Sequence, residues 1–207
     1  MNEKTDPGQT EDAAWVTIES PFDMAWMRRF IARPERVMRI NSLMEYGRWD
    51  DEGNGKFRIS GKNLGHGREF SYRLATETLA DGVRVLYDTG LKASTTFRLE
   101  PGQTADSSRL TIIDDYSAVP VEERSQRLDE VDKTLVQWGR DLHRYLHQWK
   151  RWSSVPGWRW YMNRVWLPAK PSTRRISFML IVITAMEFIA FLAVFLIFWL
   201  ELDRFLD

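Results

Sequence analysis

Short runs of alternating apolar and polar residues, the pattern of half-buried β-strands, occur at residues 14–19 and repeatedly from 43 to 117. The clearest run is 68–79, where Phe70 and Tyr72 share one face. Similar runs cover 14–19, 43–49, 56–61, 83–88, 92–100 and 109–117. Turn residues separate them, and Asn54-Gly55 is the strongest short hairpin signal. Because short turns join the last six runs, we predict that these form a curved antiparallel meander.

Helical periodicity occurs in two parts of the chain, between the first two strands and after the last one. Residues 22–32 and 34–40 predict two short helices between the first two strands. After Pro120, apolar residues recur at alternating steps of three and four, which predicts one amphipathic helix of about 30 residues. Its apolar positions are Leu128, Val131, Leu135, Trp138, Leu142, Tyr145, Trp149 and Trp152. We expect its first half to cover the sheet, giving an α+β fold; a coiled-coil seam is the alternative.

A continuous apolar stretch, Ile176–Leu200, dominates the end of the chain. As a helix rising about 1.5 Å per residue, it is long enough to cross a hydrocarbon core of about 30 Å. The competing interpretation is a buried helix of a globular protein. Its length and the flanking charges, Arg174 and Arg175 before it and Glu201 after it, favour the membrane. We therefore expect a single-pass C-terminal transmembrane anchor.

Basic residues gather before this stretch. Residues 140–175 contain nine Lys and Arg and one acidic residue, Asp141. Such an excess beside a span marks the cytoplasmic side of a membrane and suits anionic lipid headgroups. Aromatic rings among the arginines favour lipid over nucleic acid as the partner. The predicted membrane-interface residues are Trp158, Arg159, Trp160, Tyr161, Arg164, Trp166, Lys170, Arg174 and Arg175.

These patterns predict five segments. They are a polar, disordered tail (1–12), a soluble domain (13–152), a basic aromatic juxtamembrane segment (153–175), a transmembrane helix (176–200) and a short tail (201–207). The first 12 residues contain no apolar stretch of the kind found in a signal peptide. Cysteine is absent, so disulfides and thiol chemistry are excluded.

One charge interrupts the predicted span. Glu187 lies near its middle, where an ionised carboxylate costs a few kcal/mol. Thr184, Glu187 and Ala190 are spaced by three residues and share one side of the helix. Small and polar residues on one side favour contact with another transmembrane helix, from a second copy or a larger membrane protein. A tolerated, protonated Glu187 is the alternative.

The order of the predicted elements resembles the START-like superfamily, the helix-grip fold of polyketide cyclase/dehydrase and coenzyme-Q-binding-like proteins. The residues that carry the resemblance are 16–21 (VTIESP), Ala25-Trp26, 96–101 (TFRLEP) and 109–112 (RLTI). It covers about residues 13–150 and concerns architecture more than chemistry. The resemblance implies a cavity between the curved sheet and the long helix, holding an apolar ligand such as a lipid, quinone or isoprenoid.

Residues that share one parity within their strands are the candidates for lining such a cavity. Together with two positions of the long helix, they are Tyr72, Leu74, Val85, Tyr87, Phe97, Leu99, Ile112, Asp114, Tyr116, Leu135 and Trp138. If the register of a strand differs by one residue, its other set of side chains faces inward. Asp114 and Tyr116 are also the catalytic candidates, because a carboxylate on an apolar face can act as acid or base. Alternatively, Asp114 lies near a strand end and pairs with an arginine.

Other chemistry is not indicated. The segment from Asp50 begins like a calcium loop but has Gly61 in place of the final glutamate, so we interpret it as a hairpin. His143 and His147 are four apart on a helix without a third ligand, and His66 lies in a glycine turn. We therefore expect no metal and no cofactor. The chain is expected to bind an apolar ligand at a membrane; the alternatives are an accessory subunit of a membrane complex and a cyclase or hydratase.

Overall fold

The computed structural model describes residues 13–118 and 128–206, and side chains outside 128–133 and 202–206. The predicted disordered tail and the start of the long helix before Leu128 lie outside the described residues. So do the side chains of Leu128 and Val131. The chain divides into two compact units, Met1–Pro168 and Ala169–Asp207.

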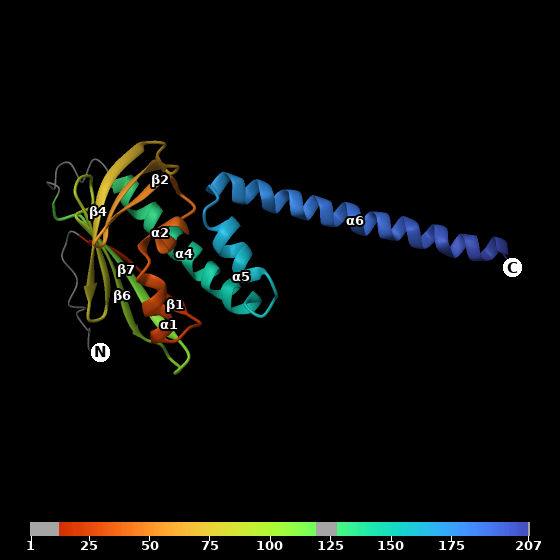
Figure 1. Ribbon diagram of the computed structural model, residues 1–207, viewed down its shortest axis with the longest axis horizontal. Coiled ribbons are helices and arrows are strands. Elements are labelled where there is room, and N and C mark those ends of the chain that lie inside the picture. Colours follow the sequence, from red (N-terminus) through yellow and green to blue (C-terminus); the bar gives the residue numbers. More distant parts are fainter. Residues whose placement is uncertain (1–12, 119–127, 207) are drawn as a thin grey trace. The chain divides into compact units, whose positions relative to one another are not determined.

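The first unit has the α+β architecture that the hydrophobic pattern predicts (Figure 1). It begins with β1 (Ala13–Ser20), α1 (Met24–Ile31) and α2 (Pro34–Arg39). The meander follows as β2 (Met44–Gly53), β3 (Lys56–Asn63), β4 (Glu69–Leu79), β5 (Gly82–Tyr87), β6 (Ser94–Pro101) and β7 (Ser108–Asp115). The helices α4 (Leu128–Trp152), α5 (Trp158–Tyr161) and the π-helical turn η1 (Met162–Trp166) complete it.

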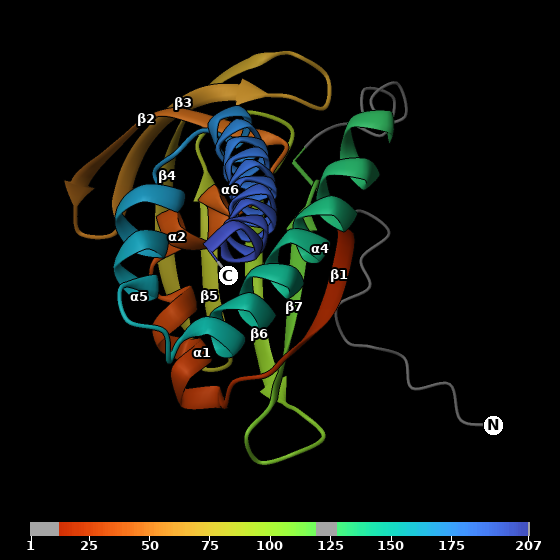
Figure 2. The same ribbon diagram turned by 90° about the vertical axis from the view of Figure 1, so that its right-hand side faces the viewer.

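The seven strands form one antiparallel sheet in the order β1-β7-β6-β5-β4-β3-β2. Strands β2 to β7 are the predicted meander, and β1 joins its last strand (Figure 2). The β2–β3 hairpin turns through Asn54 and Gly55, both with positive φ (52° and 71°), as a two-residue hairpin loop requires. Its register shifts twice along β2, between Tyr46 and Arg48 and between Asp51 and Gly53.

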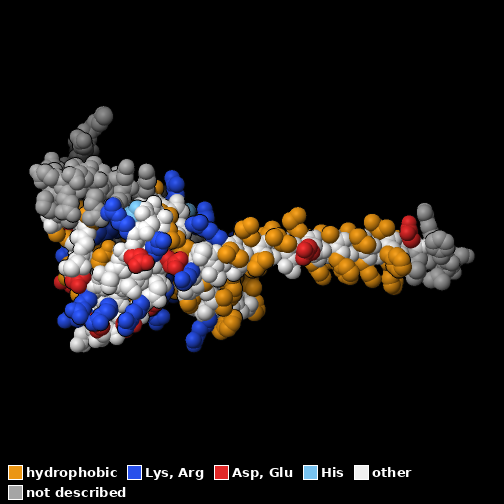
Figure 3. Space-filling model, turned by 90° about the horizontal axis from the view of Figure 1, so that it is seen from above, with side chains coloured by type: hydrophobic (Ala, Val, Ile, Leu, Met, Phe, Trp, Pro, Cys, Tyr) orange, Lys and Arg blue, Asp and Glu red, His pale blue; other side chains and the backbone are white. Residues whose placement is uncertain are grey.

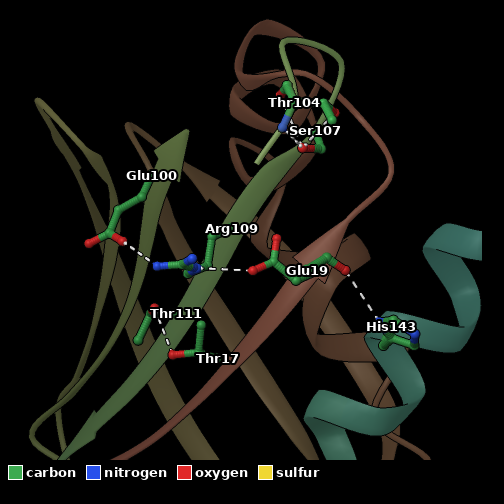
Figure 4. A network of polar contacts seen from close by, with 8 residues as sticks. All are labelled: Thr17, Glu19, Glu100, Thr104, Ser107, Arg109, Thr111 and His143. Carbon is green, nitrogen blue, oxygen red and sulfur yellow. Dashed lines mark hydrogen bonds and ion pairs between the residues drawn. The ribbon is translucent and has the colours of Figure 1, made fainter. Parts of the chain in front are cut away.

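The outer surface of the sheet near β1 is polar (Figure 4). Arg109 Nε lies 3.1 Å from Glu19 Oε1, and Arg109 Nη1 lies 3.6 Å from Glu100 Oε2. Exposed pairs of this kind contribute about 1 kcal/mol or less each. His143 Nδ1 donates to the backbone oxygen of Glu19 at 3.2 Å, which ties α4 to β1. The two histidines of α4 therefore lie at the rim of the helix–sheet contact.

Helices α1, α2 and α4 pack on the opposite face and complete the helix-grip arrangement (Figure 2). From α4, the buried apolar side chains are Leu135, Trp138, Leu142, Tyr145, Leu146 and Trp149. Trp138 packs edge-on against Phe97 of β6, with ring centres 5.5 Å apart, and its Nε1 donates to Val37 O at 3.1 Å. The apolar stripe of α4 thus packs on the sheet rather than forming a coiled-coil seam. Trp152, in the last position of α4, is 43% exposed.

The segment after α4 is also part of the first unit. Met162 is buried, and the Trp166 ring centre lies 5.5 Å from that of Tyr145. Trp158 and Tyr161 are partly buried against the core, while Trp160 is 65% exposed. Compact structure therefore continues from the predicted domain, 13–152, to Pro168, because these aromatic rings pack on it.

The second unit consists of α6 (Pro171–Leu206). Figure 3 shows hydrophobic side chains all along its described part, and they are exposed. Within the described residues it is the one helix long and apolar enough to cross a membrane. It includes the predicted span 176–200 together with Thr184, Glu187 and Ala190.

Candidate ligand-binding site

The first unit contains a cavity of about 170 Å³. It lies at one end of the interior, where strands β2 to β4 meet the β5–β6 connection and the first turns of the described α4. Its aromatic lining residues are Tyr46, Phe70, Tyr72, Tyr87, Tyr116 and Trp138. A dry protein cavity of about 150 Å³ accepts benzene, whereas pockets for drug-sized ligands hold about 300–1,000 Å³. The enclosed space therefore fits one ring or a short branched chain.

The aromatic lining is held by contacts between its own rings. The ring centres of Tyr46 and Phe70 lie 5.6 Å apart edge-on, and those of Phe70 and Tyr72 lie 5.2 Å apart in a stack. Tyr72 meets Tyr87 edge-on at 5.8 Å. Such pairs contribute about 0.5–1.5 kcal/mol beyond the burial of their area. Alternate residues of β4 thus build one continuous wall with β2 and β5.

A polar cluster lies at the inner side of the cavity. Its centre is Asp114 of β7, whose side chain is completely buried. Lys92 Nζ donates to Asp114 Oδ2, and Thr95 Oγ1 donates to Oδ1 at 2.5 Å. Tyr116 Oη donates to Oδ2 at 3.5 Å. A buried carboxylate needs such partners, since an uncompensated charge costs several kcal/mol.

The hydrogen bond between Tyr87 and Thr95 can have only one direction. Thr95 has one hydroxyl hydrogen, which the acceptor-only carboxylate of Asp114 takes. The contact of 3.1 Å between Tyr87 Oη and Thr95 Oγ1 must then be donated by Tyr87. Lys92 and Tyr87 both line the cavity. Lys92 has three N–H donors, of which Asp114 uses one, so the cluster presents an ammonium to the cavity.

Burial shifts the pKa values of the groups around this cluster. It raises the pKa of Tyr87 strongly, and the Asp114 charge adds to the rise. Burial likewise raises the pKa of Tyr116, against the opposing effect of Lys92. Burial alone would lower the pKa of Lys92, but the attraction of Asp114 and neighbouring tyrosines outweighs it and the net shift is upward. At neutral pH the cluster therefore has protonated tyrosines and an ammonium.

The β5–β6 connection brings Lys92 to this position. Gly90 has φ of 108°, a left-handed conformation that side chains other than glycine rarely adopt. A Cβ at this position would lie 2.9 Å from Cε1 of Tyr72. The glycine lets the loop close against the Tyr72 ring, and two residues later Lys92 reaches Asp114.

The predicted cavity residues divide into two groups. Tyr72, Tyr87, Tyr116 and Trp138 line the cavity, and Asp114 is buried in contact with its wall. The other six, Leu74, Val85, Phe97, Leu99, Ile112 and Leu135, are buried within the core. All are inward-facing, but the helices pack closely on the middle of the sheet and leave space at one end. Their role in ligand binding stays a prediction.

Two details differ from the sequence-based interpretation. The partner of Asp114 is Lys92, so the alternative that it pairs with an arginine is wrong. Lys92 itself, with the cavity residues Met38, Asn41 and Met44, was not among the predicted positions. The signal for Lys92 is Asp114: a carboxylate on an inward face requires a cation within reach.

Of the remaining histidine candidates, His143 and His147 lie outside the cavity lining and His66 is part of it. His143 and His147 have ring centres 4.3 Å apart, and partial burial, reinforced by His143, lowers the pKa of His147. The described residues contain no group of three or more His, Cys, Asp or Glu that could hold a metal. His66 lines the cavity rather than lying only in an exposed turn. The segment from Asp50 to Gly61 forms the β2–β3 hairpin, as predicted.

No protein-family model matches the sequence, and no curated protein matches it either. Solved structures do match. Protein NE0264 from Nitrosomonas europaea is 14% identical with a TM-score of 0.49, over 69% of this chain and 99% of that one. The protein XoxI from Bacillus cereus is 9% identical with a TM-score of 0.49, over 67% and 98%. The di-domain ARO/CYC BexL from the BE-7585A biosynthetic pathway is 14% identical with a TM-score of 0.46, over 63% and 46%. The helix-grip assignment follows from this chain's own strand order and helix packing.

Proposed function

We propose that this chain is a membrane-anchored binding module for an apolar ligand with a ring-sized head that bears an oxygen acceptor. The observation that carries the proposal is the ammonium of Lys92 at the wall of an aromatic cavity. Aromatic rings supply apolar contact, and the ammonium supplies a donor for a carbonyl, hydroxyl or carboxylate oxygen. Heads of quinone or isoprenoid type have this chemistry, and a longer tail would lie outside the cavity.

The anchor supports this assignment. We propose that α6 crosses the membrane with the first unit on the cytoplasmic side, because Lys and Arg are concentrated before the span. A protein anchored there meets apolar ligands where they are most concentrated. The membrane-interface residues named above then lie near the headgroups.

Closing the cavity tests the proposal. Thr134 of α4 lines the cavity and is buried, so Thr134→Phe should fill part of it. We expect the full chain, purified in mild detergent, to yield an extractable apolar compound by mass spectrometry, and the variant to retain at most about a tenth of it. The matched control is Val136→Phe, which adds a ring to an exposed position of the same helix.

Retention of the compound by the control and its loss from Thr134→Phe would support a cavity site. Equal retention by both variants would place any bound compound elsewhere. An empty wild-type protein that also fails to bind quinone or isoprenoid alcohols would overturn the proposal.

The polar cluster supports a second candidate, a cyclase or hydratase. Tyr116 reaches the cavity and contacts Asp114, as an acid–base pair should. However, Asp114 does not line the cavity, and its oxygens already accept from three donors. Conversion of the co-purified compound by wild-type protein, lost in Tyr116→Phe, would favour this reading over simple binding.

A third role, accessory subunit of a membrane complex, rests on Glu187. We predict that Glu187→Leu weakens association with another transmembrane helix about tenfold, since a hydrogen bond in such contacts contributes about 1–2 kcal/mol at most. Native gels or crosslinking in mild detergent measure the assembly, with Phe188→Leu, an exposed apolar neighbour, as the control. Unchanged assembly together with improved insertion would identify Glu187 as a tolerated charge.

A further inference from the structure

A second hollow in the first unit lies outside the cavity described above. It is an open groove of about 710 Å³ between α2 and the residues that follow η1. Three arginines of the α2 region, Arg33, Arg36 and Arg39, line it at intervals of three residues. The groove is also lined by the apolar side chains of Phe57, Leu167 and Pro168. The groove thus combines cationic and apolar side chains.

The arginines differ in their contacts. Arg39 Nε is bonded to Glu35 Oε1 at 2.7 Å, so this carboxylate offsets its charge. Arg33 is exposed, and the described residues provide no carboxylate partner for Arg33 or Arg36. Two cations therefore remain for an anion in the groove. Asp51 is the other carboxylate at its edge.

Arg36 is held in place before any ligand binds. Its Nη2 donates to Tyr145 Oη at 3.0 Å, and its Cζ lies 4.6 Å from the ring centre of Trp149 and 5.2 Å from that of Phe30. Fixing a guanidinium on aromatic rings removes much of the entropy that it would otherwise lose on binding. A guanidinium also donates strong charge-assisted hydrogen bonds to phosphate oxygens.

Chain connectivity places the groove near the start of the apolar helix. Pro168 lines the groove, and α6 begins at Pro171. Three residues span about 10 Å at most. This bound holds for every orientation of the two units. If α6 crosses a membrane, as the proposed function states, the end of the groove formed by Pro168 lies within about 10 Å of the first residue of that helix.

We infer that this groove binds the phosphate headgroup of a phospholipid, with Arg33 and Arg36 contacting the phosphate. The apolar side chains of Phe57, Leu167 and Pro168 fit the glycerol and the first acyl carbons, which a soluble phosphate lacks. The site is separate from the cavity of Tyr72 and Lys92, with which it shares no lining residue.

The test uses the full chain in mild detergent and counts lipid adducts by native mass spectrometry during titration with phosphatidylglycerol. We expect one tightly held lipid, with an apparent Kd raised about tenfold in Arg33→Gln and further in the Arg33→Gln, Arg36→Gln double variant. Asp51→Asn should lower the Kd about twofold, because it removes the opposing charge. The control is Arg28→Gln with Arg29→Gln, two exposed arginines of α1 outside the groove.

An equal loss of binding in the α1 control would show diffuse surface attraction and would overturn the inference. Glycerol phosphate alone should bind at least tenfold more weakly than the lipid, since it lacks the apolar contact. Equal binding would overturn the lipid assignment and leave a site for soluble phosphate. The side chain of Arg33 is exposed, so its single variant stays informative if the double variant unfolds. Cavity ligand retention and membrane fractionation, measured on Arg33→Gln, report separately on the proposed function and should not change.

Discussion

Replacing Lys92 with methionine is expected to lower the free energy of unfolding by about 3–5 kcal/mol. The substitution leaves the carboxylate of Asp114 completely buried without its cation. Thr95 and Tyr116 still donate to it, but neither supplies a charge. Chemical denaturation of the full chain in mild detergent, followed by near-UV circular dichroism of the first unit, measures the change.

Two further variants identify charge as the cause. Arg48→Met breaks an exposed ion pair with Asp50, whose side chains are 65% and 40% exposed, and should cost less than about 1 kcal/mol. Lys92→Met combined with Asp114→Leu removes both charges and should recover more than half of the lost stability. If the double variant loses as much unfolding free energy as Lys92→Met and Asp114→Leu lose together, the effect is due to packing rather than charge.

Alkaline pH should unfold the first unit steeply. The folded-state pKa values of Tyr46, Tyr87 and Tyr116 are raised above 10, chiefly by burial, and that of Lys92 is raised by its neighbours against the effect of burial. Between the unfolded and folded pKa values, the folded state binds more protons than the unfolded state. The free energy of unfolding is therefore fully present below about pH 10 and falls above it, by about 1.4 kcal/mol per pH unit for each group.

Four groups acting together give a slope of up to about 5.5 kcal/mol per pH unit. Thermal melting of the first unit between pH 8 and 11, a window set by ordinary tyrosine and lysine pKa values, records it. Tyr87→Phe and Tyr116→Phe should each reduce the slope by the contribution of one group, about 1.4 kcal/mol per pH unit. A melting temperature that stays level through this range would contradict the raised pKa values.

The architecture was largely accessible from the sequence because its signals are local. Alternation in 68–79, the Asn54-Gly55 turn and the change of period after Pro120 each depend on neighbouring residues. With short connections, a meander is the simplest antiparallel arrangement. The two outer strands of this meander are β2 and β7, and β1 pairs with β7. The structure has the predicted α+β fold.

The position of the cavity was not accessible in this way. Parity shows that Leu74 and Tyr72 face the same side, but not which of them meets a helix and which meets open space. That depends on where α2 and α4 cross a curved sheet, a property of the whole unit. Lys92 illustrates the same limit: it lies in a loop whose path is set by Gly90 and by the partner that it reaches on β7.

The two register shifts in β2 bear on how copies of this protein behave when crowded. β2 ends the strand order of the described sheet, and an outermost strand is a template for unwanted pairing between molecules. Each register shift breaks the even spacing of the backbone groups along the strand. Arg48, Asp50 and Asp51 add charge along the same strand. An incoming strand finds neither a continuous ladder nor a neutral surface, so β2 is a poor template for pairing between copies of this chain.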